Sequence, residues 1–241
     1  MIEKKIHYIW VGRNPLPPLA IKCIDSWKKH CPDYEIIEWN EDNFDIHANL
    51  YCKQAYESRK WAFVSDYMRL HILYNHGGIY MDTDVEVIKP IDEFLHLQAF
   101  SGFESSITIS TGIMAAQKGN VWIKELLKYY DKATFIKSNG KLNLTTNVIT
   151  ITKDTKKLYP KLKLNNTEQH FEHVSFYPSE YFCPFNCDTR SLNLTPNTFA
   201  IHHFVASWSP KNYSNSKIKY LIKKIIGNNL LYFYRRLRYK I

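Results

Sequence analysis

The sequence lacks an apolar run long enough to cross a membrane, and it lacks the cysteine pairs of a disulfide or zinc framework. Its five cysteines are an odd number, and no two are spaced Cys-x-x-Cys, which favours a reducing compartment. The N-terminus opens Met-Ile-Glu-Lys-Lys-Ile-His without the apolar core of a signal peptide, and no stretch reaches the roughly 18 apolar residues of a membrane span. We therefore expect a cytoplasmic protein.

Glycine is scarce and acidic residues are missing from the C-terminal segment. With 8 glycines in 241 residues and 45% hydrophobic residues, collagen-like and disordered classes are excluded. The length suits one α/β domain with a full core.

Charge is divided unevenly along the chain. Residues 211–241 contain nine Lys or Arg and no acid, which leaves 23 basic and 23 acidic residues before them, so the whole net charge of +9 lies in this tail. Apolar residues alternate with the cations between Ile218 and Ile241, a pattern typical of a basic amphipathic helix on an anionic membrane surface. We expect a catalytic body over 1–210, and over 211–241 a helical tail that is broken at 227–229 and attaches peripherally to the inner face of the cytoplasmic membrane. The alternative is that this helix packs on the body.

The order of apolar runs predicts alternating strands and helices. A buried strand over 4–12 leads to a helix over 18–30 and a second strand over 34–39. Later strands are expected over 94–103, 113–116 and 199–205, with a helix over 121–130. This order predicts an α/β fold with a mixed sheet flanked by helices.

The most informative segment runs from Ser65 to Pro90. Asp82 and Asp84 sit two apart on an extended run, so alternation directs both carboxylates to one side. Such a pair also occurs in surface turns, but two converging carboxylates suit Mg²⁺ or Mn²⁺, which keep open positions for the phosphates of a nucleotide. A helix that begins near Ser65 or Asp66 and stops at Gly77-Gly78 precedes them.

Asp66 and Arg69 lie one turn apart on that helix. A structural reading makes Asp66 a cap and Arg69 its surface partner. Arg69, however, lies in a mostly apolar run, where an unpaired guanidinium is costly, and its donor fork fits phosphate oxygens.

These residues resemble the signature of the glycosyltransferases with a DXD sugar-binding motif (family 32-like), which include bacterial capsular and lipopolysaccharide sugar transferases. The resemblance rests on three ordered blocks: 5–12 (KIHYIWVG), 65–84 and 200–208 (AIHHFVASW). It implies a nucleotide-sugar-binding fold of the GT-A type and Mn²⁺ or Mg²⁺ as cofactor. The chain lacks the Thr-Gly-Pro often found at 144–148 in this family, which puts sugar contacts from that segment in doubt.

The resemblance also implies site roles. Trp10 stacks on the nucleotide base rather than serving only as a core aromatic, and Tyr80 packs beside the sugar. Asp66 binds donor-sugar hydroxyls, and Arg69 binds the sugar or the diphosphate. Asp84, and Asp82 through water, hold the metal.

Two adjacent histidines compete for the third ligand position. Because His202 and His203 alternate faces, one of them can point to the metal; the family setting favours His203, with His202 as the alternative. Ser207 and Trp208 are expected to close over the diphosphate as a lid that excludes water.

The expected activity is metal-dependent, retaining hexose transfer from a nucleotide-diphosphate donor, with UDP-galactose the first choice, to an oligosaccharide or lipid-linked glycan in bacterial surface polysaccharide synthesis. Retention comes from the resemblance. The alternatives are a glycosylating toxin or effector that acts on a protein, and a non-catalytic module that binds sugar nucleotides or nucleic acid. We expect no nucleic-acid partner, because the excess charge is confined to the tail.

Overall fold

The computed structural model describes residues 1–186 and 191–205. Its helices are α1 (Pro18–His30), α2 (Leu50–Glu57), α3 (Trp61–His76), α4 (Val121–Lys132), α5 (Asn147–Leu158) and α6 (Ser179–Phe182), with 3-10 turns η1 (Ile46–Ala48) and η2 (Asp92–Phe94). Its strands are β1 (Lys5–Ile9), β2 (Glu35–Trp39), β3 (Gly78–Met81), β4 (Val85–Val87), β5 (Ala99–Ser105), β6 (Thr108–Ala116), β7 (Gln169–His170), β8 (Ser175–Tyr177), β9 (Phe185–Asn186), β10 (Ser191–Leu192) and β11 (Ala200–His202).

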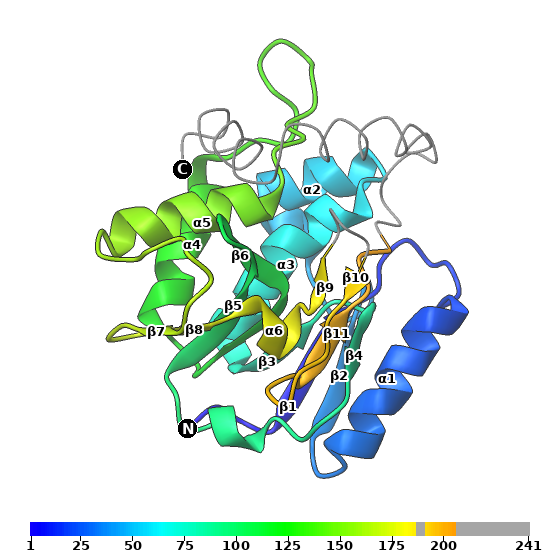
Figure 1. The fold of residues 1–241 in the computed structure, drawn as a ribbon. Coiled ribbons are helices and arrows are strands. Elements are labelled where there is room, and N and C mark those ends of the chain that lie inside the picture. The colour runs from blue at the N-terminus through cyan, green and yellow to red at the C-terminus, as the bar shows by residue number, and fades with distance from the viewer. Residues whose placement is uncertain (187–190, 206–241) are drawn as a thin grey trace.

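A seven-stranded mixed sheet forms the centre, in the order β2-β1-β3-β6-β5-β8-β7 (Figure 1). β1 runs parallel to β2 and β3, whereas β6 is antiparallel to both β3 and β5. Two further pairs, β9 with β10 and β4 with β11, lie outside this sheet. The predicted mixed α/β sheet flanked by helices is confirmed.

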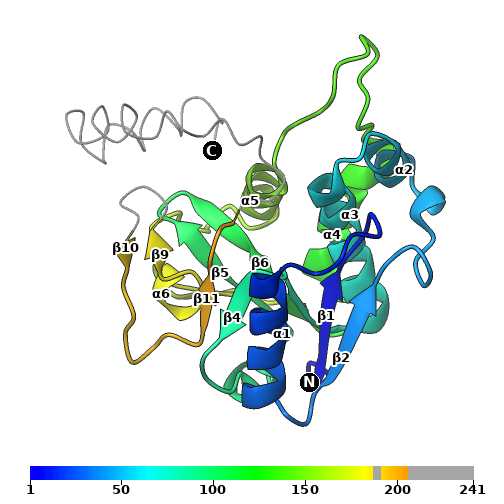
Figure 2. The same cartoon turned by 90° about the vertical axis from the view of Figure 1, so that its right-hand side faces the viewer.

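Alternate residues of the central strands feed two separate cores. Ile9 and Tyr80 pack with α2, α3 and α4, whereas Ile6, Tyr8 and Ile79 pack with α1 and β4. In Figure 2, α1 lies on one side of β1 and the group of α2, α3 and α4 on the other. The near-continuous apolar character of β1 and β3 follows from this burial on both faces.

Helix α1 is anchored to β4 by its buried tryptophan. Trp27 Nε1 donates to the carbonyl of Val85 at 2.8 Å, and Ser26 Oγ accepts from Val87 N at 2.9 Å. α1 itself begins with Pro18 at its first position, where the missing N–H costs nothing. The strand that follows the acidic pair is therefore fixed from behind by a helix near the N-terminus.

Several predicted bounds differ from the structure. The helix before the glycine pair begins at Trp61 rather than at Ser65 or Asp66. It follows Lys60, which makes no side-chain cap hydrogen bond, so no capping residue marks this start in the sequence. The extended run expected after Gly78 is two strands, β3 and β4, separated by a turn at 82–84. The strand expected over 94–103 begins only at Ala99, after η2.

Three helices were not predicted: α2, α5 and the short α6. α5 carries mostly polar residues, and it begins inside the 144–148 segment, at Asn147. Among the described residues, none of the helices combines the length and the apolarity needed to cross a membrane. The tail prediction and the boundary at residue 210 concern residues outside the described ranges.

Candidate active site

A cleft of about 1620 Å³ opens at the edge where β1 and β3 end and β6 begins. Ligands of open α/β sheets bind at the carboxyl ends of the parallel strands, and here those ends deliver Trp10 after β1 and Asp82 after β3. The N-terminus of α5 and residues of the β9–β10 hairpin complete the walls. All three predicted sequence blocks contribute to this one cleft.

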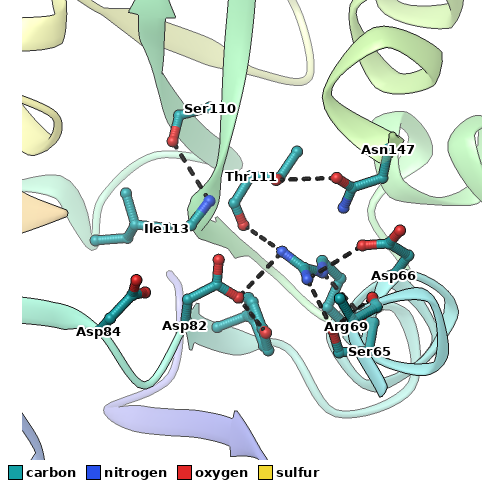
Figure 3. Close-up of polar contacts among 12 residues, drawn as sticks. Ser65, Asp66, Arg69, Asp82, Asp84, Ser110, Thr111, Ile113 and Asn147 are labelled. Carbon is teal, nitrogen blue, oxygen red and sulfur yellow. Dashed lines mark hydrogen bonds and ion pairs between the residues drawn. The ribbon is translucent and has the colours of Figure 1, made fainter. Parts of the chain in front are cut away.

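The turn after β3 holds the two carboxylates. The backbone N–H of Asp82 donates to the carbonyl of Gly112 at 2.8 Å, and the N–H of Val85 donates to the carbonyl of Asp82 at 3.0 Å. The strand ends before this tight turn, so the turn geometry, and not the alternation of side chains along a strand, sets the direction of the Asp84 side chain. Both side chains line the cleft (Figure 3).

His202 joins this pair from β11. Its Nε2 lies 3.2 Å from Asp84 Oδ1 and 3.9 Å from Asp82 Oδ2. Burial favours the neutral ring, but the hydrogen bond with Asp84, followed by the Cys183 thiol, raises the pKa of His202 well above its usual value. Asp84 is likewise penalised by burial, yet its hydrogen bonds with His202 and with the amide of Val205 hold its pKa below the usual range.

The preference for His203 as third ligand is corrected by this arrangement. His203 Nε2 contacts Glu86 Oε2 at 2.9 Å, and Glu86 also binds Lys22 at 2.8 Å. The reason is register: β11 pairs with β4 so that His202 stands opposite Val85. His202 therefore shares the buried face of β4 with Val85, and the next residue turns to the other face.

Arg69 ties the site together from α3. Its Nη1 donates to the carbonyl of Thr111 at 2.7 Å and lies 3.3 Å from Asp82 Oδ1, and its Nη2 lies 3.3 Å from Asp66 Oδ1. The side chain is 4% exposed. Figure 3 shows the guanidinium between Asp82 and Asp66. Arg69 is thus a buried, fully paired cation and not the surface partner of a capping residue.

Asp66 is the carboxylate at the far side of Arg69 from Asp84. Complete burial raises the pKa of Asp66 to about 7; Arg69 opposes this shift and Asp82 adds to it. A carboxyl group that lines a cleft and has a pKa near neutral pH is typical of functional sites. The expected sugar contact for Asp66 stays a prediction.

Tyr80 lines the cleft, and its expected place beside the sugar stays a prediction. It is 2% exposed, its hydroxyl donates to Asp82 Oδ1 at 2.6 Å, and the Arg69 guanidinium lies 4.6 Å from the centre of its ring. Tyr80 therefore contacts both Asp82 and Arg69 and helps to orient their side chains.

Trp10 also lines the cleft. Its Nε1 donates to the carbonyl of Asn14 at 2.6 Å, and Trp61 lies along the same wall. Gly12 allows that wall to close, because a Cβ there would lie 2.7 Å from Cε2 of Trp61 and its φ is +95°. The aromatic side chains of Trp10 and Trp61 in the lining fit the predicted stacking on the nucleotide base, which stays a prediction.

Asn147 was missed by sequence reasoning. It is the first residue of α5, it is 7% exposed and it lines the cleft. Its Oδ1 accepts from Thr111 Oγ1 at 3.2 Å, while its Nδ2 is buried with no hydrogen-bond partner among the described residues. Such a donor is costly to leave unpaired, so the amide points to a ligand. The only sequence signal was that residues 144–148 fall where the family carries a sugar-side segment.

The donor set fits a divalent cation. One ligand atom from each of Asp82, Asp84 and His202 lies within 4.8 Å of the others. Two carboxylates suit Mg²⁺ and Mn²⁺, and an imidazole shifts the preference toward transition metals. Ser207 and Trp208, predicted to form the lid, lie outside the described residues.

Comparison with known proteins identifies the motif region. Residues 17–101 match the family model described as "Glycosyltransferase sugar-binding region containing DXD motif". The match includes α3 and both aspartates of the turn, and it ends before His202.

Relatives extend the similarity beyond this region. The chain is 24% identical over 225 residues to an uncharacterized glycosyltransferase of Acanthamoeba polyphaga mimivirus, covering 87% of this chain and 85% of that one. It is 29% identical over 159 residues to the Legionella pneumophila "Subversion of eukaryotic traffic protein A", covering 52% of this chain and 24% of the other. It is 29% identical over 138 residues to inositol phosphoceramide mannosyltransferase 3 of Schizosaccharomyces pombe, covering 56% and 38%. The alignments with the Legionella and fission-yeast relatives thus span well under half of those proteins' length.

A solved structure shares the fold. The "PaToxG Glycosyltransferase" superposes with a TM-score of 0.51 at 21% identity, covering 66% of this chain and 70% of that one. This likeness supports the GT-A-like arrangement of the mixed sheet and its helices.

Proposed function

The chain belongs to the family 32-like glycosyltransferases with a DXD sugar-binding region, and we propose that it transfers a hexose from a nucleotide-diphosphate donor to a carbohydrate hydroxyl with retention of configuration. The observation that carries the proposal is the convergence of Asp82, Asp84 and His202 in a cleft that Trp10 also lines. A UDP-sugar, with UDP-galactose as the first choice, is the proposed donor.

The metal would be held by Asp82, Asp84 and His202, and Mn²⁺ is proposed over Mg²⁺ because of the imidazole. When bound, it supplies positive charge for the diphosphate as the sugar leaves. The chain's own residues hold the rest of the site. Arg69 orients Asp82 through its 3.3 Å contact, and Trp10 offers an aromatic face to the base.

Asp66 and Asn147 are proposed to bind the hydroxyls of the donor sugar. Figure 3 shows both of them on the far side of Arg69 from Asp84. Asp66 supplies an acceptor and Asn147 Nδ2 an unpaired donor, which is a complementary pair for adjacent hydroxyl groups. Retention by front-face attack, with the leaving phosphate taking the acceptor proton, remains part of the proposal.

The acceptor and the location of the reaction are also proposals. An oligosaccharide or lipid-linked glycan of a surface polysaccharide is preferred, with the protein attached to the inner face of the cytoplasmic membrane through residues 211–241. Similarity to the Legionella protein whose name refers to eukaryotic traffic favours a protein acceptor as the second candidate. Assays that supply saccharide and protein acceptors in parallel separate the two.

The test of this function is a panel of nucleotide sugars with Mn²⁺ and EDTA arms. One donor is expected to be hydrolysed or transferred in Mn²⁺ and not in EDTA. Asp84→Asn and His202→Ala are expected to reduce that activity at least a hundredfold, because each removes a ligand; Asp84→Asn, which keeps the size of the side chain, is expected to change the thermal melt little.

His203→Ala serves as the matched control, since His203 contacts Glu86 instead of the metal ligands. It is expected to stay within a few-fold of wild type. Substantial activity of Asp84→Asn in EDTA would overturn the metal assignment.

A further inference from the structure

The imidazole of His202 has only a weak polar neighbour besides the two aspartates. Its Nδ1 is buried and meets no hydrogen-bond geometry among the described residues, although the Cys183 thiol interacts with the ring. A histidine that binds a metal through one ring nitrogen is usually oriented by a hydrogen bond from the other, and a thiol forms only weak hydrogen bonds. Packing contacts are therefore expected to contribute to keeping Nε2 directed at Asp82 and Asp84.

Gly112 on β6 provides one part of this support. A Cβ on Gly112 would lie 2.7 Å from both Cε1 and Nδ1 of His202, closer than side-chain atoms approach one another. The backbone of Gly112 does not have a positive φ, so space, and not conformation, requires glycine here. Its carbonyl also accepts the N–H of Asp82 at 2.8 Å, so one residue contacts two of the proposed ligands.

Phe204 provides the other part. Its ring stacks on the His202 ring with 3.9 Å between centroids and 26° between planes. Phe204 has a φ of +51°, a left-handed conformation that is strained for a non-glycine residue and occurs preferentially at functional sites. The next residue fixes this conformation, because Val205 N donates to Asp84 Oδ2 at 2.9 Å.

We propose that Gly112 and Phe204 are positioning residues that together set the orientation of the His202 ring and thereby the metal affinity of the site. The inference rests on the proposed function only in taking Asp82, Asp84 and His202 as ligands. Packing supplements the weak thiol contact: the glycine Cα on β6 leaves room for the ring, and an aromatic residue after β11 stacks on it.

The test measures Mn²⁺ affinity of the metal-free protein by titration calorimetry, with the thermal melt recorded in parallel. Gly112→Ala is expected to weaken Mn²⁺ binding tenfold or more. Gly102→Ala is the matched control, because Gly102 lies on neighbouring β5 and its Cβ would meet Cδ2 of Phe182 at 3.0 Å, away from the ligands. The control is expected to lower the melting temperature while Mn²⁺ affinity stays at the wild-type value. Equal Mn²⁺ affinities for wild type and a folded Gly112→Ala would overturn the role of Gly112.

A second set of variants keeps the test decisive if Gly112→Ala fails to fold. Phe204→Tyr retains the ring and is expected to bind Mn²⁺ like wild type. Phe204→Gly relieves the backbone strain but removes the ring, and it is expected to bind Mn²⁺ at least fivefold more weakly. Wild-type affinity in Phe204→Gly would show that the stacking does not position the ligand.

His202→Ala separates this inference from the function on which it rests. If His202→Ala binds Mn²⁺ as tightly as wild type, the ligand assignment is wrong and the positioning role falls with it. If His202→Ala binds weakly while Gly112→Ala and Phe204→Gly bind normally, the ligand assignment stands and only the positioning role is rejected.

Discussion

At the scale of single residues, His7 shows how the sheet depends on a neutral imidazole. It is fully buried on β1, its Nε2 donates to the carbonyl of Gly77 at 2.9 Å and its Nδ1 accepts from Trp39 Nε1 at 3.1 Å. Both nitrogens are satisfied only in the neutral form, because a proton on Nδ1 would face another N–H. Burial accordingly lowers the pKa of His7 to about 4, against the opposing effect of the Gly77 hydrogen bond.

This arrangement predicts an acid-sensitive stability. Between pH 6.5 and 4, His7 binds a proton in the unfolded chain but not in the folded protein. The free energy of unfolding therefore decreases as pH falls through that window, by up to about 3 kcal/mol. Denaturant unfolding at pH 7 and pH 4.5 measures the loss. His7→Gln is expected to lose less stability over this interval than wild type, whereas His47→Gln, at an exposed position, is expected to lose as much. Identical losses in all three proteins would exclude His7 as the cause.

Residue roles were predictable from sequence where a motif fixed both spacing and backbone. Asp66, Arg69, Asp82 and Asp84 all line the cleft as expected, because α3 and the turn after β3 are contiguous in the chain. The choice between His202 and His203 was not predictable, since it depends on the register of β11 against β4. Residues 85–87 and 200–202 are far apart in sequence, and no local pattern records which of their side chains stand opposite.

At the scale of elements, α5 was missed for a related reason. Its sequence Asn-Val-Ile-Thr-Ile-Thr-Lys-Asp-Thr-Lys-Lys-Leu is rich in β-branched residues, which favour strands. Packing decides the outcome: Thr152 Oγ1 accepts from the N–H of Ile109 on β6 at 2.9 Å, and Thr155 Oγ1 accepts from Trp122 Nε1 at 2.9 Å. These tertiary bonds are not visible in the sequence, yet they bring the first residue of α5 to the cleft.

The placement of α5 predicts a specific effect of Asn147→Ala. Loss of the unpaired Nδ2 N–H group is expected to weaken binding of the nucleotide sugar about threefold to tenfold, since a neutral hydrogen bond contributes about 0.5–1.5 kcal/mol. The melting temperature is expected to stay close to wild type, because the amide pairs only with Thr111. Donor titration monitored by tryptophan fluorescence measures the affinity.

Asn120→Ala supplies the contrasting element-end variant. Asn120 caps α4 by accepting from Ile123 N and also binds the carbonyls of Gln98 and His173. Its removal is expected to cost about 1 kcal/mol or more of stability with donor affinity unchanged. The reverse pattern, with Asn147→Ala affecting only stability, would remove Asn147 from the sugar site.

At the scale of the whole molecule, the uneven charge of the chain predicts how it associates with a membrane. The body over 1–210 is formally neutral and residues 211–241 carry all of the excess charge, and each basic residue near an anionic leaflet contributes on the order of 1 kcal/mol. The 241-residue chain is expected to float with anionic vesicles at low salt and to be released at high salt. A form that lacks residues 214–241 is expected to stay in solution and to retain transfer to a soluble acceptor.

Neutral phosphatidylcholine vesicles provide the control for this measurement, and neither form is expected to float with them. If the 241-residue chain does not bind anionic vesicles, or if the shortened form is insoluble, a tail that packs on the body is favoured instead. The sequence pattern alone could not distinguish these two outcomes, because an amphipathic helix buries its apolar face equally well on lipid or on protein.

The separate β4–β11 pair also sets the order in which a growing chain acquires its parts. All seven strands of the central sheet lie between Lys5 and Tyr177, whereas the third proposed ligand, His202, arrives only with β11. Chains are made from the N-terminus, and domains begin to fold during synthesis. A nascent chain therefore contains both aspartates before it contains His202, and the proposed metal site is complete only after β11 has been synthesised and has paired with β4.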